Sequence, residues 1–427
     1  LNLYEKKSYV GYTATPFANV FIHPNEYTSE AGPGLFPKSF IHDLPEPNNY
    51  YGINKIFSEE IGDIDEQFLE IIDDHCDEPQ DINCKEGWIP PKHYTDHEAL
   101  IDGNNNHPQS LKRAIISFII SCCIRNIRGQ INDHKSMLIH VSKYIKVNRQ
   151  IKFQVINTID KIRSTLLNPG TDEFQNLKNE IENELQNIKD ENKFNFDEIF
   201  NSKVGLKDVV SEISLNIKNL SGDSADFLDY EQYKRTKDRG LQTIIIGGDR
   251  LSRGITLEGL STSYFLRSTK MYDTLMQMGR WFGYREGYQD LCKLFTTDDM
   301  MDWFYHIAEA TDELKLQFKI MSEQNLTPKD FGLKVKSHPL LMITSRVKMQ
   351  HGHKVTSSFI DHFGQTTSFD LSKIDVNFRL IENLINEIGD PKENGLVKRA
   401  YGNEKNSYVW KNINSKYVIN FLNKYEI

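Results

Sequence analysis

The stretch of residues 243–285 constrains the fold of this chain more than any other. It opens with a β-branched run, TIII, which is too short for a helix and leads directly into Gly247 and Gly248. A second short strand is expected at 263–266 and an apolar-faced helix at 272–282. Glycines permit close backbone approach, and arginines bind anions. The order strand, glycine turn, strand, helix therefore predicts an α/β module whose polar rim suits phosphate.

Two segments within this stretch carry a family resemblance. Residues 249–254, DRLSRG, are similar to the fifth conserved motif of superfamily two helicases, and residues 277–285, QMGRWFGYR, resemble the sixth. Taken together, residues 248–259 and 277–285 resemble the Z-one (Z1) domain family more closely still. This helicase-associated family is usually labelled an endonuclease. The resemblance extends more weakly from about residue 111 to about residue 348.

The resemblance implies a fold and a set of site residues. The expected fold is α/β: a RecA-like parallel-sheet lobe of the helicase C-terminal type, with helical insertions and a small β-rich and α C-terminal region. Motif six implies Gln277, Arg280 and Arg285 as catalytic residues, with Arg280 on the helix at 272–282. Motif five implies a nucleotide-binding set: Gly248, Asp249, Arg253, Gly254, Thr256 and Glu258.

This sequence departs from the helicase pattern at three positions. Arg285 lies two residues beyond the usual second arginine of motif six, Thr256 stands where many relatives carry an Asp, and Gly248 replaces a threonine. The two latter changes favour backbone contacts to the nucleotide. Trp281, Phe282 and Tyr284 are open to two interpretations, stacking on a base or packing at the lobe surface.

Two further segments are candidates for nucleic-acid contact. Residues 13–16, TATP, follow a predicted strand and are similar to the third helicase motif, which implicates Thr13 and Thr15. A core strand predicted at 137–142 leads to Lys143, Lys146 and Arg149. Between residues 112 and 149 many cations are opposed only by one acid, so this cluster is a candidate for backbone-phosphate binding with little base preference.

The phosphate-binding Gly-x-x-x-x-Gly-Lys-Ser/Thr loop of such motors is missing from the sequence. Because the chain begins at the third motif, we expect a fragment that shares ATP and Mg²⁺ with an absent N-terminal P-loop lobe and does not turn over ATP alone. The expected partners are that lobe, DNA and subunits of a restriction or phage-defence system. Two alternatives stay open: an endonuclease acting on DNA directly, and a non-catalytic interaction module with a degenerate motor lobe.

The domain boundaries follow from changes in composition. We expect the tail of a first lobe at 1–23, an acidic insertion or linker at 24–109, a second lobe at 110–299 with a helical insertion at about 155–222, and a family-specific region at 300–427. A parallel sheet with this plan should place Val10, Ile139, Ile245 and Phe265 on strands of one or two such sheets.

The acidic insertion allows several interpretations. A solvated helix that makes no phosphate contact is expected, and inward-facing nuclease carboxylates are the alternative. A zinc site could also be assembled on paper from two cysteines and three histidines, although the spacing resembles no common finger: His75, Cys76, Cys84, His93 and His97.

Composition limits the class of protein. The 427 residues are 38% hydrophobic and 26% charged, which is ordinary for a globular protein, and the net charge of −9 argues against a chain that coats nucleic acid. Five cysteines without paired metal spacing fit a reducing cytosol, so a cytoplasmic location is expected. No apolar run reaches the length of a membrane span.

Overall fold

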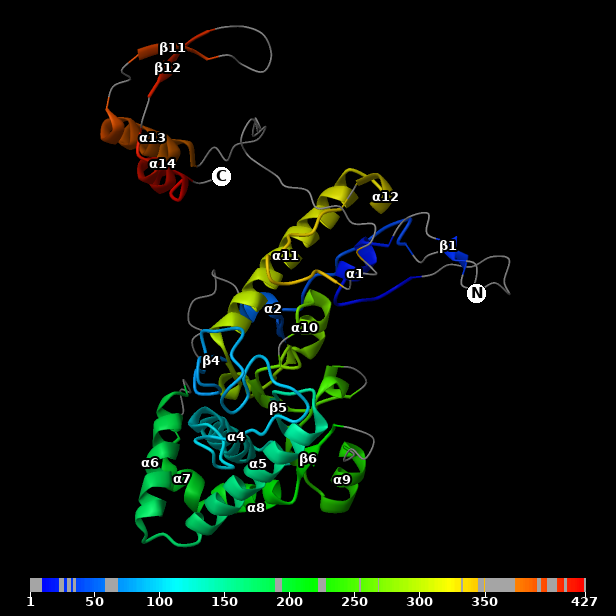
Figure 1. The fold of residues 1–427 in the computed structure, drawn as a ribbon, viewed down its shortest axis with the longest axis vertical. Helices are drawn as coiled ribbons and strands as arrows, with labels where there is room; N and C mark the ends of the chain where they lie inside the picture. The colour runs from blue at the N-terminus through cyan, green and yellow to red at the C-terminus, as the bar shows by residue number, and fades with distance from the viewer. Residues whose placement is uncertain are drawn as a thin grey trace. The chain divides into compact units, whose positions relative to one another are not determined.

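The computed structural model describes residues 10–22, 27–28, 32–33, 36–57, 68–188, 194–221, 228–252, 255–267, 269–331, 333–344, 349, 373–389, 393–397, 405–410 and 413–425. The chain divides into two compact units, residues 1–352 and 353–427 (Figure 1).

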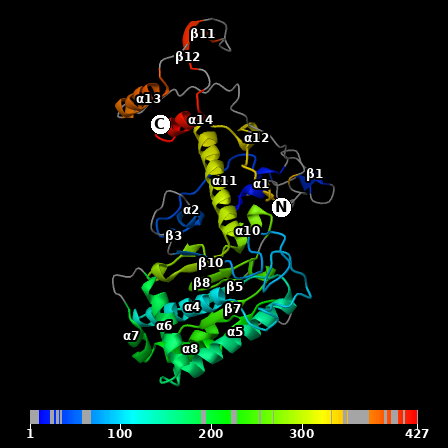
Figure 2. The same cartoon turned by 60° about the vertical axis from the view of Figure 1, so that its left-hand side comes forward.

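A six-stranded sheet forms the centre of the first unit, in the order β4-β10-β8-β5-β7-β6 (Figure 2). Its strands are β4 (Leu69–Ile71), β5 (Lys135–His140), β6 (Ile217–Asn219), β7 (Gln242–Ile246), β8 (Leu260–Phe265) and β10 (Lys293–Thr296). Each pair of neighbours is parallel. The central strands are buried along their whole length, as expected for a parallel sheet covered on both faces.

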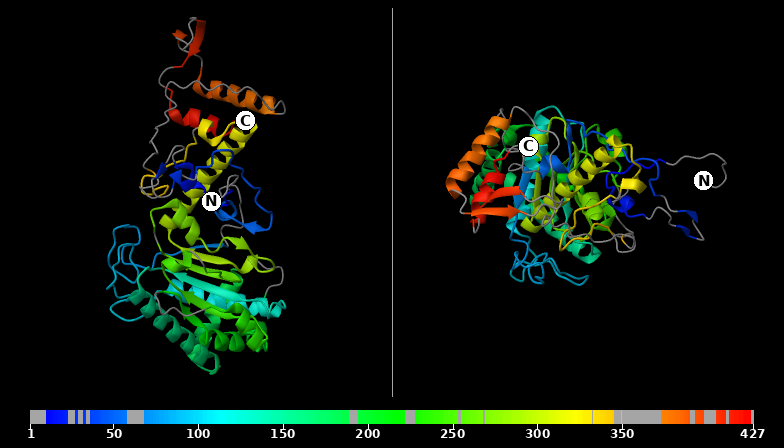
Figure 3. Two further views of the ribbon diagram at one scale, coloured as in Figure 1. Left: turned by 90° about the vertical axis from the view of Figure 1, so that its right-hand side faces the viewer. Right: turned by 90° about the horizontal axis from the view of Figure 1, so that it is seen from above.

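Helices cover both faces of this sheet. On one face lie α4 (Gln109–Ile127), α5 (Ile145–Leu166) and α8 (Leu206–Ser214), with α6 (Asp172–Gln186) and α7 (Phe196–Asn201) packed around them. On the other face lie α10 (Tyr272–Met278) and the long α11 (Asp298–Glu323), together with the 3-10 turn η1 (Asp249–Ser252) (Figures 2 and 3).

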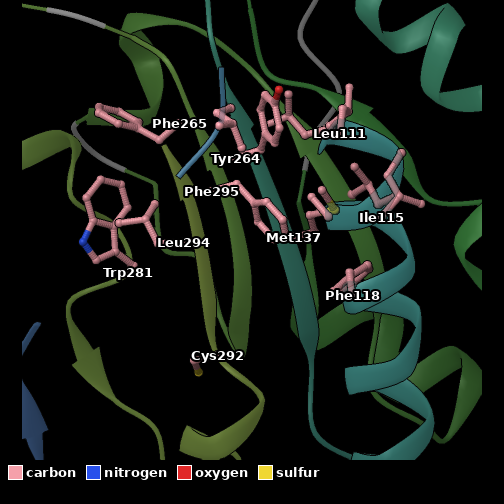
Figure 4. Packing of buried hydrophobic residues seen from close by; sticks show 14 of the residues in the cluster. Leu111, Ile115, Phe118, Met137, Tyr264, Phe265, Trp281, Cys292, Leu294 and Phe295 are labelled. Carbon is pink, nitrogen blue, oxygen red and sulfur yellow. The ribbon is translucent and has the colours of Figure 1, made fainter. Parts of the chain in front are cut away.

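Side chains alternate between the two faces along each strand. Figure 4 shows Met137, Tyr264 and Phe295 on the side of α4, where they meet Leu111 and Ile115. The next side chain of β8, Phe265, points to the opposite side, where its ring lies 4.9 Å from that of Trp281. The core is therefore two-sided, and β-branched and aromatic residues fill it.

Short elements complete the first unit. They are α1 (Phe17–Val20), α2 (Ile53–Ile56), α9 (Tyr230–Lys237), α12 (Pro328–Phe331), η2 (Gln289–Leu291) and the strand pairs β1 (Tyr27–Thr28) with β2 (Gly32–Pro33) and β3 (Tyr50–Tyr51) with β9 (Gly283–Tyr284). The second unit contains α13 (Ile374–Ile388), α14 (Ser415–Leu422) and the hairpin of β11 (Glu393–Val397) and β12 (Lys405–Val409).

The structure confirms an α/β fold with a parallel sheet. Ile139, Ile245 and Phe265 lie on adjacent parallel strands, as predicted. The expected strand at Val10 is wrong: residues 10–15 have no regular structure, and Val10 is exposed and pairs with no strand of the described residues. Because all four residues were the test of the helicase-like interpretation, that test fails at Val10, and only the sheet around β5, β7 and β8 agrees with it.

Other predicted elements need correction. The insertion after β5 holds four helices and the edge strand β6, whose three residues carry too little pattern to be recognised. Helix α10 ends at Met278, because Gly279 leaves helical backbone angles, so Arg280 lies beyond the helix and not on it. In the family-specific region at 300–427, where a β-rich part was expected, residues 345–348 and 350–372 lie outside the described residues.

Candidate functional site

The strand order reverses at β5, which is the feature that positions a site. From β5 the chain passes to β6 and β7 on one side and then to β8 and β10 on the other. The carboxyl ends of β5, β7 and β8 therefore meet at a topological switch point, where open α/β sheets bind their ligands.

Gly248 brings two of these strand ends into close contact. A Cβ atom on Gly248 would lie 3.1 to 3.2 Å from backbone atoms of Ser142 and Lys143. A side chain there would have to push the loop after β5 away from the end of β7. Gly248 was predicted to bind nucleotide, and here it packs the backbone of one loop against the other.

An arginine that the motif comparison did not single out follows β8. The Arg267 guanidinium donates to the Asp249 carboxylate over 3.2 Å, so the ends of β7 and β8 are joined by an ion pair. Asp249, a predicted nucleotide-binding residue, is exposed. An arginine immediately after a predicted buried strand was the available signal for Arg267.

A pocket of about 100 Å³ opens beside this pair. Its walls include Lys143 and Tyr144 after β5, Arg267 after β8, and His93 from the segment that precedes α4. Two basic side chains therefore meet at the switch point.

The buried His140 ends β5 next to this pocket. Its ring lies 5.5 Å from that of Phe265, and neither ring nitrogen has a hydrogen-bond partner among the described residues. Burial, aided by the charge of Arg267, lowers the pKa of His140 to about 3. His140 is therefore neutral at pH 7.

The remainder of motif five leads away from the switch point. Glu258 lies at the amino edge of the sheet, where its carbonyl accepts from the Ser136 hydroxyl and its carboxylate lies 3.8 Å from His134. Thr256 is exposed two residues earlier. Arg253 and Gly254 lie outside the described residues. The structure thus places Gly248 and Asp249 at one edge of the sheet and Glu258 at the other.

The residues of motif six occupy different environments. Gln277 lies in the last turn of α10 and is partly exposed. Arg280 is also partly exposed, its guanidinium donates to the Ile255 carbonyl, and burial lowers its pKa. Arg285 is 8% exposed, and it donates to the carbonyls of Trp281 and Tyr284 over 2.9 and 2.8 Å. The guanidinium of Arg285 therefore holds its own loop together.

The three aromatic residues of this motif also differ in exposure, and Phe282 is partly exposed and packs against Phe57 and Phe304. Trp281 is buried and contacts Phe265 and Phe304, which fits packing rather than base stacking. Tyr284 is exposed in β9, and its ring meets the edge of Tyr50.

Thr13 and Thr15 lie in an irregular segment. Thr13 is exposed, and its hydroxyl accepts from the Thr15 amide over 3.1 Å. This is ordinary turn chemistry.

The basic cluster divides into an inner and an outer part. The cations nearest its start bind carboxylates or carbonyls elsewhere in the fold: Lys112 pairs with Glu180, Arg113 with Glu184, Arg128 with Asp290, and the buried Lys135 donates to backbone carbonyls. The outer part makes no ion pair with the described part of the chain and is exposed where α5 begins: Lys143, Lys146 and Arg149.

The sulfur and imidazole groups of the acidic insertion form no metal cluster. Among the described residues, no group of three or more His, Cys, Asp or Glu side chains is placed to hold a metal ion. All five cysteines are free thiols and buried, and burial raises the pKa of Cys76 to about 12. His93 lies at the pocket, whereas His75 contacts Cys76.

Comparison with known proteins gives one match. The Z1 domain model matches residues 110–343, more than half of the chain. No curated protein and no solved structure matches it. No helix in the described part of the chain is both long and apolar enough to cross a membrane. By this match, the chain belongs to the Z1 domain family.

Proposed function

We propose that this chain is the second lobe of an ATP-dependent motor that acts on DNA, helicase- or translocase-like, and that it serves a restriction or phage-defence system. Membership of the Z1 family and the similarity of residues 249–254 and 277–285 to motor motifs support this proposal. In such a motor this lobe closes on nucleotide bound by a P-loop lobe.

The observation that carries the proposal is the cationic switch point. Lys143 and Arg267 converge where β5 and β8 end, and exposed Lys146 and Arg149 extend the same surface along the start of α5. Fixed cations at the carboxyl edge of a parallel sheet suit a phosphate polymer.

One residue of this lobe, Arg280, is suitably placed to contact the phosphates of ATP. Arg280 keeps a partly exposed guanidinium beside the loop at 255–259, so it is the candidate to face the triphosphate, whereas Arg285 is committed to backbone carbonyls. Bound ATP supplies the phosphoryl group whose transfer to water drives such motors.

The test is DNA-stimulated ATP hydrolysis with the P-loop lobe supplied. We expect no turnover from the present chain alone, and turnover that DNA increases when the P-loop lobe and this chain are joined. A joined protein whose hydrolysis is insensitive to DNA would contradict the proposal. Metal-dependent nicking of DNA by the present chain alone would support the endonuclease alternative instead.

A further inference from the structure

The pocket at the switch point has one wall from outside the Z1 match. Lys143, Tyr144 and Arg267 belong to the matched region, but Pro90, Pro91 and His93 precede residue 110. The sequence assigned this part of the chain to an acidic stretch that makes no phosphate contact. The fold brings it to the edge of the sheet where Lys143 and Arg267 lie.

The outer wall is fixed in place along α5. The indole N–H of buried Trp88 donates to the Gln154 side chain over 2.9 Å, and the amide groups of Gln150 and Gln154 both donate to the Ala99 carbonyl. Gln150 and Gln154 are one turn apart, so they present their amides on the same helix face. Hydrogen bonds to α5 therefore hold the segment at 88–99 in place (Figure 3, light blue).

The hydrogen bonds of His93 define its state. The Pro90 carbonyl can only accept, so Nδ1 of His93, at 2.8 Å, carries the hydrogen. Nε2, 2.8 Å from the Ser142 hydroxyl, then accepts from it. Burial lowers the pKa of His93, and the nearby charges of Arg267 and Lys143 lower it further. The His93 ring is therefore neutral and lines the pocket together with Lys143 and Arg267.

The lining contains no carboxylate. Arg267 pairs with Asp249, which lies outside the lining and binds the guanidinium through Nε and one terminal nitrogen. Lys143 is exposed, and its Nζ lies 5.0 Å from the centre of the Tyr144 ring. The pocket is therefore lined by one guanidinium and one ammonium group, which suits a tetrahedral anion.

The volume selects the size of the ligand. About 100 Å³ is well below the roughly 300 Å³ at which small-molecule sites begin. A pocket of this volume suits one phosphate group better than a nucleoside.

We propose that this pocket binds a single phosphate group, with Lys143 and Arg267 as its cationic ligands and the segment at 88–99 as its outer wall. The source of that phosphate rests on the proposed function: a DNA strand lying across the switch point would insert one backbone phosphate. A terminal phosphate or free phosphate has the same chemistry, and the experiment separates these sources.

The test uses the full chain and four variants: Lys143→Gln, Arg267→Gln, Arg267→Lys and, as the control, Lys161→Gln. Lys161 is exposed on the same helix, α5, but belongs neither to the pocket lining nor to the cations at the start of that helix. Titration with inorganic phosphate against chloride of equal ionic strength measures binding in the pocket, and fluorescence anisotropy with a single-stranded oligonucleotide measures DNA binding. We expect Lys143→Gln and Arg267→Gln to weaken phosphate binding about tenfold or more, Arg267→Lys to restore little, and Lys161→Gln to leave it unchanged.

The DNA measurements identify the source. If the phosphate is a backbone diester, Lys143→Gln weakens binding of oligonucleotides with and without a 5′-phosphate equally. A loss confined to the 5′-phosphorylated oligonucleotide would assign the pocket to a strand end. If wild type and Lys143→Gln bind phosphate equally well, the proposal that this pocket is a phosphate site is wrong. If the chain binds phosphate in the pocket but does not bind DNA, the proposed function is wrong and the phosphate site is still supported.

Discussion

At the residue scale, two arginines that are close in sequence differ in the exposure of their guanidinium groups. Arg280 and Arg285 differ by five positions, yet one guanidinium is partly exposed and the other is buried among carbonyls of its own loop. An arginine finger needs donors that are available to phosphate. The structure therefore favours Arg280 over Arg285 for that role, which stays a prediction.

Arg280→Ala should lower ATP turnover by about a thousandfold in the protein that includes the P-loop lobe, because an arginine finger contributes that much to phosphoryl transfer. Arg280→Lys should restore little, since an ammonium group cannot reproduce the guanidinium fork. Steady-state hydrolysis at saturating ATP and DNA measures this. Arg235→Ala, an exposed change on α9, is the control, and an Arg280→Ala variant within about threefold of wild type would remove Arg280 from the active site.

His140 links a single residue to the pH dependence of stability. Its pKa is about 3 in the folded state, below the ordinary 6.5. Between these two pH values His140 is protonated in the unfolded chain and neutral in the folded chain. Stability should therefore be full above pH 6.5 and fall as the pH drops from 6.5 toward 3, by up to about 1.4 kcal/mol per pH unit from this group. Replacement by Phe should flatten that slope, as measured by urea unfolding at pH 7, 6 and 5. Parallel curves for wild type and His140→Phe would contradict this account.

At the element scale, helix α5 organises the segment before α4. Gln154 is 2% exposed and serves Trp88, Ala99 and Asn105 with one amide group. Further along the same helix, the hydroxyl of Thr158 lies 2.6 Å from His107. One face of α5 therefore carries polar side chains that form hydrogen bonds with the irregular segment at 88–107. These hydrogen bonds hold the segment in place although it forms neither a strand nor a helix there.

Gln154→Ala should lower the free energy of unfolding by about 1–3 kcal/mol, because it leaves the buried indole N–H of Trp88 without its acceptor. Urea unfolding measures the loss, and limited proteolysis between residues 88 and 107 reports the release of the segment. The control is Gln175→Ala on α6, an exposed glutamine whose amide donates to Asn179 one turn along the same helix, and this change should cost well under about 1 kcal/mol. Equal effects of the two changes would show that burial at Gln154 is not decisive.

At the scale of the whole molecule, a net charge of −9 coexists with a local cationic surface. Carboxylates from distant parts of the chain neutralise Lys112, Arg113 and Arg128, and the cations at the start of α5 stay exposed. DNA affinity should therefore depend on this surface and not on the net charge.

Neutralising Lys143, Lys146 and Arg149 together should reduce the salt dependence of DNA affinity by about two to three in the slope of log K against log salt concentration, because each phosphate contact contributes about 0.7 to 0.9. Anisotropy titrations at several salt concentrations measure the slope, with Lys112→Gln as the control from the same basic sequence cluster. An unchanged slope in the triple variant would contradict a role for this surface, and a strong dependence on one short DNA sequence would contradict backbone binding.

The sequence by itself determined the central sheet and its main helices. The run TIII at 243–246 and the apolar stretch at 111–124 must both be buried, because a β-branched strand and an apolar helix each need an apolar surface to pack against. The short strands β4, β6 and β9 escaped prediction because two or three residues carry no period, and their pairing comes from strands far along the chain. Only the tertiary structure decided which charged groups share a site. It divided motif five between two edges of the sheet, paired Arg267 with Asp249, and brought His93 of an acidic stretch to Lys143. These contacts depend on where strands end and which loops meet there, and local patterning does not encode either.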